Sequence, residues 1–189
     1  MSPTTVHKSI LDIRHSALAV IDIQESFRTV IPDFETVAIR ASIAVRGFQI
    51  MGLPVLVTEQ YPKGLGRTAA EIQRVLAEDR EAYEKTAFSS CGAAPFVESL
   101  NSLGIRQVVL CGLETHVCVN QTAHDLLAAG FEVHLLLDCV SSRFDYNRLI
   151  GIAKMERSGV VPSSVEMAFF ELMRNARHEK FKEIQALIK

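Results

Sequence analysis

The chain has 189 residues, of which 48% are hydrophobic and 22% charged, and its formal net charge is −2. This length suits one domain with a well-buried core and does not require two. The small net charge gives no basic field that would hold a nucleic-acid backbone, so nucleic acid is not an expected partner. No apolar run approaches the roughly 20 residues that cross a bilayer, so membrane attachment is not expected either.

The first residues of the chain are mostly polar. Residues 1–16, MSPTTVHKSILDIRHS, lack the apolar core of a signal peptide. We expect them to form a polar N-terminal leader, followed by a single domain over residues 17–189.

The cysteine pattern favours reduced thiols. The four cysteines form no CxxC pair, which fits a cytoplasmic protein better than a disulfide framework. They are Cys91, Cys111, Cys118 and Cys139. A zinc site made by Cys118, His116 and His124 would lack the paired ligand spacing of structural zinc motifs, so it has little weight.

The first predicted strand covers residues 17–23, ALAVIDI. It has almost no polar face, which suggests a parallel sheet covered on both sides. Asp22 interrupts the strand at its carboxyl end, the edge where functional groups gather in open α/β sheets. A helix cap or a surface turn is the ordinary alternative for this aspartate.

A helix is predicted over residues 34–51, ending at Gly52, and a strand over residues 54–58. The next stretch, EQYPKGLGRT at 59–68, is rich in Pro and Gly, so we expect a loop at the same edge as Asp22. Its glycines do not have the spacing of a P-loop or a dinucleotide fingerprint, and no cofactor is expected.

Helices and strands alternate along the rest of the chain. Predicted helices cover residues 68–76, 95–103, 144–157, 166–176 and 180–188, and predicted strands cover residues 81–85, 131–138 and 160–165. Strands separated by helices indicate an α/β fold with a parallel sheet, and right-handed crossovers place helices on both faces.

The most informative stretch is residues 107–129, QVVLCGLETHVCVNQTAHDLLAA. An apolar run, Gly112 and a change to helical spacing predict a buried strand, a tight turn and a helix. With Thr115 as N-cap and Gly130 beyond the helix end, Cys118 falls in the first helical turn. A helix N-terminus and a nearby cation can hold a thiolate at neutral pH, so Cys118 is a candidate nucleophile. The alternative is a small buried core residue.

Four blocks of sequence together form a specific signal. They are AVIDIQ at 19–24, KTAFS at 85–89, GLETHVCVNQTAHDLLAAGFEV at 112–133 and DCVSSR at 138–143. In these blocks the chain resembles the isochorismatase-like cysteine hydrolases, most of all the isochorismatase-domain-containing subgroup. The resemblance covers nearly the whole chain. It implies a three-layer α/β/α sandwich around a six-stranded, Rossmann-like parallel sheet, and a homo-oligomer.

The resemblance also implies roles for individual residues. The family's catalytic triad falls on Asp22, Lys85 and Cys118, with Asp22 and Cys118 ending neighbouring strands. The amides of Glu114 and Cys118 would hold an oxyanion, after a cis peptide between Leu113 and Glu114. Lys85 would favour the thiolate, Asp22 would pass the thiol proton to the leaving amine, and Cys118 would carry a thioester.

Two departures from the family narrow the expected chemistry. Metal-dependent members carry an Asp-x-His pair where this chain has Glu59, Gln60 and Tyr61, which predicts no metal and disfavours nicotinamide. Members that cleave a vinyl ether lack the nucleophilic cysteine. Cys118 therefore argues for hydrolysis of a carbon–nitrogen bond in a small amide, ureide or carbamoyl compound. A non-catalytic oligomeric scaffold and a vinyl-ether hydrolase are the alternatives.

Gln24, Phe27, Tyr61 and Phe88 lie in or beside the matched motifs, so they are candidate residues for binding a small-molecule substrate. Phe27 and Phe88 are equally interpretable as core aromatics. His116 is discounted as a base for the cysteine, because residues two apart on a helix do not face each other.

The apolar residues of the last two predicted helices exceed what a monomer surface usually carries, if any of them remain outside the core. They include Met167, Phe169, Phe170, Leu172 and Met173. This surplus agrees with self-association.

Overall fold

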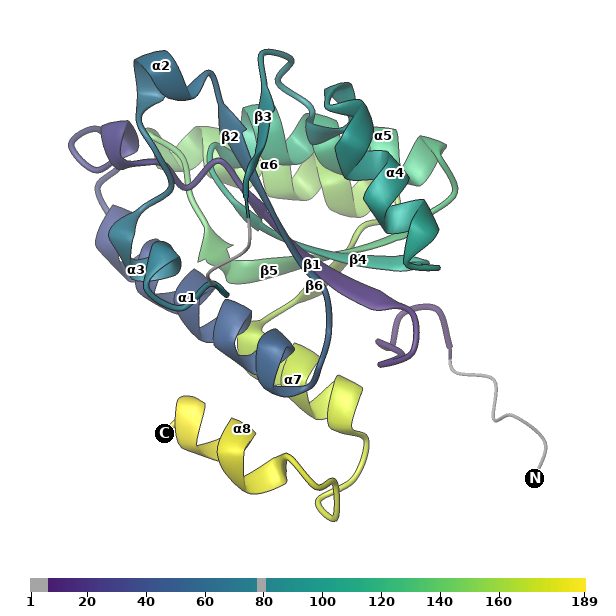
Figure 1. The fold of residues 1–189 in the computed structure, drawn as a ribbon. Helices are drawn as coiled ribbons and strands as arrows, with labels where there is room; N and C mark the ends of the chain where they lie inside the picture. Colours follow the sequence, from purple (N-terminus) through teal and green to yellow (C-terminus); the bar gives the residue numbers. More distant parts are fainter. Residues whose placement is uncertain (1–6, 78–80) are drawn as a thin grey trace.

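The computed structural model describes residues 7–77 and 81–189, and Figure 1 shows one central sheet with helices on both sides. The six strands pair in parallel in the order β3-β2-β1-β4-β5-β6. They are β1 (Ser16–Ile21), β2 (Val55–Gln60), β3 (Tyr83–Lys85), β4 (Gln107–Gly112), β5 (Glu132–Val140) and β6 (Val161–Ser163). The predicted three-layer sandwich around a six-stranded parallel sheet is confirmed.

The helices divide between the two faces of the sheet. On one face, α1 (Phe34–Ile50) and α7 (Val165–Met173) pack against the sheet, and α3 (Ala70–Gln73) and α8 (Phe181–Leu187) pack against α1. The other face packs against α4 (Ala94–Ser102), α5 (Asn120–Ala128) and α6 (Asp145–Arg157). In the described part of the chain, no helix combines the length and apolar character needed to span a bilayer.

Four short helical turns follow the carboxyl ends of the first four strands. They are η1 (Glu25–Phe27), α2 (Pro62–Leu65), η2 (Ser90–Gly92) and the π-helical η3 (Thr115–Val119). The Pro- and Gly-rich segment read as a loop therefore contains one turn of helix, which has proline in its first turn. These turns place four separate parts of the chain at one edge of the sheet.

Strand β1 has no solvent-facing side, as its sequence predicts. All six of its residues are buried. Leu18 and Val20 belong to the apolar cluster under α1 and α7, whereas Ala19 and Ile21 belong to the cluster under α4 and α5. Side chains alternate across a strand, so a strand covered on both faces reads as a continuous apolar run.

Residues 7–16 of the expected leader contact the rest of the fold, and residues 1–6 lie outside the described part. Leu11 is fully buried, and its amide donates to Glu171 Oε2 at 3.1 Å. The Gln107 side chain accepts from the Asp12 amide at 2.6 Å, and Ser16 already belongs to β1. The segment just before β1 thus packs on the fold, because a buried leucine and backbone hydrogen bonds fasten it.

Two predicted helices are shorter than their sequence patterns. The helix expected over 68–76 is confined to α3, because Gln49 of α1 captures the following backbone: its Nε2 donates to the Val75 carbonyl at 2.6 Å and its Oε1 accepts from the Ala77 amide at 3.2 Å. The helix expected over 166–176 ends at Met173, where Arg174 turns left-handed with a φ of 59°.

Gly112 ends β4 at the point where the chain leaves the sheet. Its φ is 141°, and a Cβ at this position would lie 2.1 Å from the carbonyl oxygen of Ile21. No side chain fits between the two backbones, so glycine permits the ends of β1 and β4 to approach each other.

Replacing Gly112 with alanine is expected to lower the free energy of unfolding by about 1–3 kcal/mol or more, because overpacking adds to an unfavourable φ. Gly130→Ala is the matched control. Gly130 also has a positive φ, 89°, but a Cβ there would meet nothing within 4 Å. Urea denaturation should therefore show the smaller loss for Gly130→Ala, and equal losses would contradict this account.

Candidate active site

The candidate triad residues come from three strand ends that the sheet order brings together. Asp22 follows β1, Lys85 ends β3, and Cys118 lies in η3 directly after β4. The strand order reverses between β1 and β4, where Ile21 is in register with Gly112. Open α/β sheets bind ligands in the crevice at this switch point. The predicted placement of Asp22 and Cys118 at the ends of neighbouring strands is confirmed.

Asp22 has a fully buried carboxylate with two protein partners. Thr58 Oγ1 donates to its Oδ1 at 2.8 Å, and Lys85 Nζ donates to its Oδ2 at 2.6 Å. The residue has a left-handed backbone, with a φ of 49°, a conformation that aspartate tolerates better than most residues. This turn directs the carboxylate over the ends of β2 and β3.

Lys85 is not the solvated lysine that its polar flanks would indicate. Its side chain is completely buried. Besides Asp22, its ammonium donates to Gln60 Oε1 at 2.8 Å and to the Phe88 carbonyl at 2.9 Å. A buried ion pair is tolerated only when hydrogen bonds satisfy its remaining donors and acceptors, and these contacts do so.

Cys118 lies in a π-helical turn and not in the first turn of an α-helix. Thr115, expected to cap the helix, is inside this turn, and its hydroxyl donates to the Ser141 carbonyl at 2.8 Å. The cap expected at Thr115 is therefore wrong, because that hydroxyl is engaged by the segment after β5. The peptide between Leu113 and Glu114 is cis, as the resemblance implies.

The surroundings of the Cys118 thiol disfavour its ionised form. Burial, the largest cause, and the Asp22 carboxylate, through its charge and a hydrogen bond, raise the pKa of Cys118 to about 12, and the charge of Lys85 opposes them. The direction of this shift is opposite to the one expected for a thiolate at neutral pH. The ammonium charge is balanced by Asp22, so it cannot offset the desolvation of the sulfur. Asp22 is then the group placed to accept the thiol proton.

Cys118 opens onto a cavity of about 340 Å³. This volume is at the small end of ligand pockets. Its lining comes from the segments after β1, β2, β3, β4 and β5. The lining residues are Ser26, Phe27, Val30, Gln60, Leu65, Phe88, Glu114, Val117, Cys118 and Arg143.

Two of the four predicted substrate-binding residues line this cavity. Phe88 is 55% exposed at its rim, so it is not a core aromatic, while Phe27 both lines the cavity and packs on the core. Gln24 is buried, and its amide binds the backbone of Gln60 and Gly66.

These contacts of Gln24 indicate a positioning role, because its hydrogen-bonding groups already hold the segment after β2.

Tyr61 is 54% exposed and lines a different pocket with Pro62 and Lys63. Its left-handed backbone, with a φ of 37°, places the ring over Gly64. Neither Gln24 nor Tyr61 is among the residues that line the Cys118 cavity.

Several residues of the site escaped the sequence reasoning. Thr58 and Gln60 hold the Asp22–Lys85 pair, and their polarity at the end of an apolar strand was the available signal. Arg143 Nε donates to the Glu114 carboxylate at 2.9 Å at the cavity wall. Arg143 ends the matched block DCVSSR, but no local pattern assigns it a partner.

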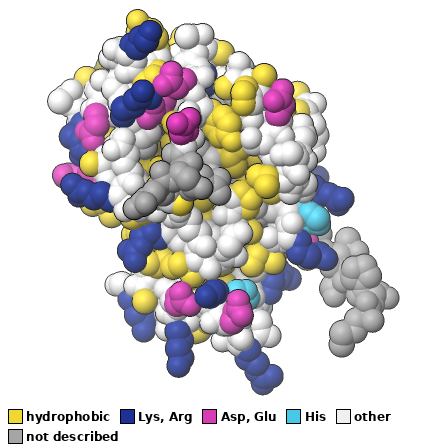
Figure 2. Space-filling view, in the orientation of Figure 1, with side chains coloured by type: hydrophobic (Ala, Val, Ile, Leu, Met, Phe, Trp, Pro, Cys, Tyr) yellow, Lys and Arg dark blue, Asp and Glu magenta, His cyan; other side chains and the backbone are white. Residues whose placement is uncertain are grey.

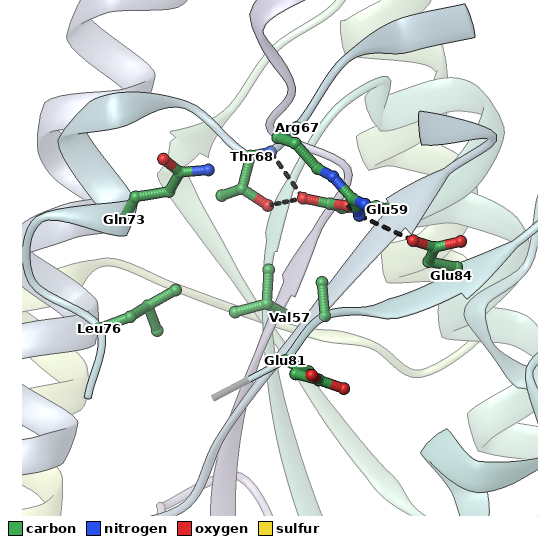
Figure 3. A pocket seen from close by; sticks show the side chains of 9 residues that line it. Val57, Glu59, Arg67, Thr68, Gln73, Leu76, Glu81 and Glu84 are labelled. Atoms are coloured by element: carbon green, nitrogen blue, oxygen red, sulfur yellow. Dashed lines mark hydrogen bonds and ion pairs between the residues drawn. The ribbon is translucent and has the colours of Figure 1, made fainter. Parts of the chain in front are cut away.

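The residues at the position of the family's metal ligands do not fit a metal. Figure 3 shows Glu59 in a separate pocket, where its carboxylate binds Arg67 at 2.9 Å and the Thr68 hydroxyl at 2.8 Å. Gln60 is engaged by Lys85, and Tyr61 is turned to the surface. Among residues 7–77 and 81–189, no group of three or more His, Cys, Asp or Glu side chains is arranged to hold a metal ion.

Replacing Asp22 with Asn removes the carboxylate that raises the Cys118 pKa and leaves the lysine charge that lowers it. The pKa of Cys118 should therefore fall from about 12, and its thiolate absorbance and iodoacetamide alkylation should begin at lower pH. Cys91 is the internal control, because burial raises its pKa to about 11 without a contribution from Asp22. An unchanged or higher pKa of Cys118 would contradict this assignment.

Comparisons with known proteins agree with the fold and the motifs. The isochorismatase domain model matches residues 16–167. Isochorismatase domain-containing protein 1 of Salmo salar is 42% identical over 89% of this chain, which spans 59% of that protein's length. Isochorismatase domain-containing protein 2 of Danio rerio is 40% identical, covering 94% of this chain and 89% of that protein. A solved structure of MAR1 ribonuclease from Caenorhabditis elegans is 38% identical, with a TM-score of 0.90 over 95% of this chain and 92% of its own. The chain belongs to the isochorismatase family.

Proposed function

We propose that this isochorismatase-family protein is a hydrolase that cleaves a carbon–nitrogen bond of a small amide, ureide or carbamoyl compound through a thioester on Cys118. The observation that carries the proposal is the meeting of an acid, an amine and a thiol at one buried point. Asp22 and Lys85 are paired at 2.6 Å with fully buried side chains, Cys118 follows the neighbouring strand end, where Ile21 is in register with Gly112, and the sulfur opens onto a small cavity.

In the first half of the reaction, the Cys118 sulfur attacks the substrate carbonyl carbon while its proton passes to the Asp22 carboxylate. The amides of Glu114 and Cys118 are the proposed donors to the oxyanion that forms. When the intermediate collapses, the carbon–nitrogen bond breaks and the protonated Asp22 gives its proton to the leaving nitrogen. Ammonia or an amine leaves, and the acyl group stays on sulfur.

In the second half, Asp22 takes a proton from water, and the resulting hydroxide attacks the thioester. The carbon–sulfur bond breaks, the acid leaves, and the proton on Asp22 returns to sulfur. Lys85 keeps its charge throughout and stabilises each state in which negative charge sits on Asp22 or on sulfur. No step uses a metal, because the acid, the base and the nucleophile are all side chains of this chain.

Other functions would give different experimental results from those expected of an amide hydrolase. The C. elegans relative is named a ribonuclease, so RNA is a second candidate substrate. Figure 2 shows Lys and Arg side chains at both the upper and the lower end of the molecule, with Asp and Glu side chains among them. At the cavity wall, the charge of Arg143 is balanced by Glu114 at 2.9 Å. This balance favours a small substrate over a polyanion.

Ammonia release from a panel of small amides, ureides and carbamoyl compounds tests the proposal. Cys118→Ser should lower kcat by roughly 10⁴-fold or more, because removing a nucleophile disables the whole catalytic unit. Cys91→Ser is the matched control and should keep full activity, since Cys91 does not line the cavity.

Three results would overturn the proposal. Turnover of an enol ether that survives Cys118→Ala would favour a vinyl-ether hydrolase. RNA cleavage that depends on Asp22, without ammonia release, would favour a nuclease. Ligand binding without any turnover would favour a scaffold protein.

We also propose that the protein is a homo-oligomer. Of the apolar residues named in the C-terminal helices, Phe169, Leu172 and Met173 are buried, whereas Met167 and Phe170 are 51% and 42% exposed and remain outside the core. A second group of exposed apolar side chains lies at the start of α6. They are Phe144, Tyr146, Leu149 and Ile150, exposed by 54%, 60%, 53% and 63%. Contiguous apolar surface of this kind marks protein contacts.

Light scattering should give a mass above the 20.9 kDa of one chain. The double variant Leu149→Glu/Ile150→Glu should reduce the mass to one chain, because paired charges at an apolar contact oppose burial. Lys154→Glu is a control on the same helix that leaves the apolar group intact. A single-chain mass for the unchanged protein would contradict the assembly.

We also propose a cytoplasmic location, because the cysteines are reduced and unpaired.

A further inference from the structure

We infer that the substrate is a neutral amide with an apolar acyl group, and that an amide carrying a carboxylate beside the scissile bond is excluded. This inference rests on the proposed hydrolase function and names the substrate class of the same site. It follows from the charges around the cavity and from the side chains of its walls.

Each cation near the nucleophile already has a carboxylate partner. Lys85 is paired with Asp22 at 2.6 Å, and Arg143 is paired with Glu114 at 2.9 Å. Glu114 and Arg143 are the charged residues of the described cavity lining, so the lining has no net charge. A substrate carboxylate would find no free cation there.

Glu114, the more buried partner, holds Arg143 in place. The Glu114 carboxylate is 8% exposed, whereas the Arg143 side chain is 52% exposed. Glu114 Oε1 accepts from both the Arg143 amide, at 3.1 Å, and Nε, at 2.9 Å, and its Oε2 accepts from Nη2 at 3.3 Å. A nearly buried carboxylate cannot be left without its partner. An anionic substrate would therefore have to compete for the guanidinium while facing the negative charge of Glu114.

The rest of the cavity wall is mostly apolar. Phe27 and Val30 come from the segment after β1, Leu65 from α2, Phe88 from the segment after β3, and Val117 from η3. Val30 and Phe88 are 47% and 55% exposed. Removing exposed apolar side chains from water lowers the free energy, and an apolar acyl group bound in the cavity would cover them.

The uncharged polar side chains of the lining supply no charge that would attract a substrate carboxylate. Gln60 lines the cavity, but its Oε1 accepts from Lys85 and its Nε2 donates to the Thr86 carbonyl. The Ser26 hydroxyl carries no charge. A neutral primary amide needs polar partners only at its carbonyl oxygen and nitrogen, which the proposed mechanism places next to Cys118.

Two amides of the same shape test the inference directly. In 3-methylbutanamide an isopropyl group occupies the position that a carboxylate occupies in malonamate. The unchanged protein should hydrolyse 3-methylbutanamide with a kcat/KM about 100-fold higher than for malonamate, because juxtaposing like charges disfavours the wrong ligand strongly. Equal values, or a preference for malonamate, would overturn the inference.

Glu114→Gln frees the Arg143 guanidinium and should lower this ratio by about 10-fold or more. Glu84→Gln is the matched control: it also removes a carboxylate from an arginine, Arg67, at 2.7 Å, but outside the Cys118 cavity. The ratio should be unchanged in the control. A ratio that is also unchanged in Glu114→Gln would contradict the role of the Glu114–Arg143 pair.

Binding to Cys118→Ala protein separates this inference from the proposed function. Calorimetry should detect 3-methylbutanamide and give weaker or no binding for malonamate. If the neutral amide binds preferentially but the unchanged protein releases no ammonia from any compound, the hydrolase proposal fails and the cavity assignment stands. If malonamate is hydrolysed better, with Cys118-dependent release of ammonia, the cavity assignment fails and the hydrolase proposal stands. Absence of binding by both amides would overturn the inference.

Discussion

The buried pair of Asp22 and Lys85 is the interaction on which the arrangement of the site depends. Two charges with no solvent exposure are costly unless each is paired and hydrogen-bonded. Here the pair spans 2.6 Å, and Thr58, Gln60 and the Phe88 carbonyl satisfy the remaining groups. The ends of β1, β2 and β3 are therefore held together by one polar network. A shift of any of these strand ends would leave a charge unpaired, so the network fixes the position of the carboxylate that adjoins the sulfur.

The same pairing affects the ionisation of Cys118. Burial and the Asp22 carboxylate raise the pKa of the thiol to about 12, against the opposing charge of Lys85. In the mechanism that we propose, the thiolate forms as the proton moves to Asp22 during attack on the substrate carbonyl. At the cavity wall, Glu114 balances Arg143 in the same way, which leaves the whole site without net charge.

Much of the fold could be predicted from the sequence, because apolar runs and helical periods reflect burial directly. The strand before Asp22 reads as fully buried because helices cover both of its faces. Local sequence patterns gave wrong helix boundaries where residues distant in the sequence form hydrogen bonds. Gln49 binds the backbone after residue 73, where the helix ends. The Thr115 hydroxyl, expected to cap a helix, donates to the Ser141 carbonyl instead. The motifs identified the triad candidates, but they could not indicate that Gln24 is buried against backbone or that Tyr61 lines a different pocket.

In the proposed mechanism, the Cys118 sulfur attacks a carbonyl carbon under the control of Asp22. A crystal soaked with 3-methylbutanal is the decisive experiment, because an aldehyde adds to a thiol and has no group to expel. Continuous density should run from Cys118 Sγ to the aldehyde carbon, with the new oxygen facing the amides of Glu114 and Cys118 and the alkyl chain against Phe27 and Phe88. An unmodified Cys118 in a crystal whose cavity is open to solvent, or an adduct on another cysteine only, would contradict it.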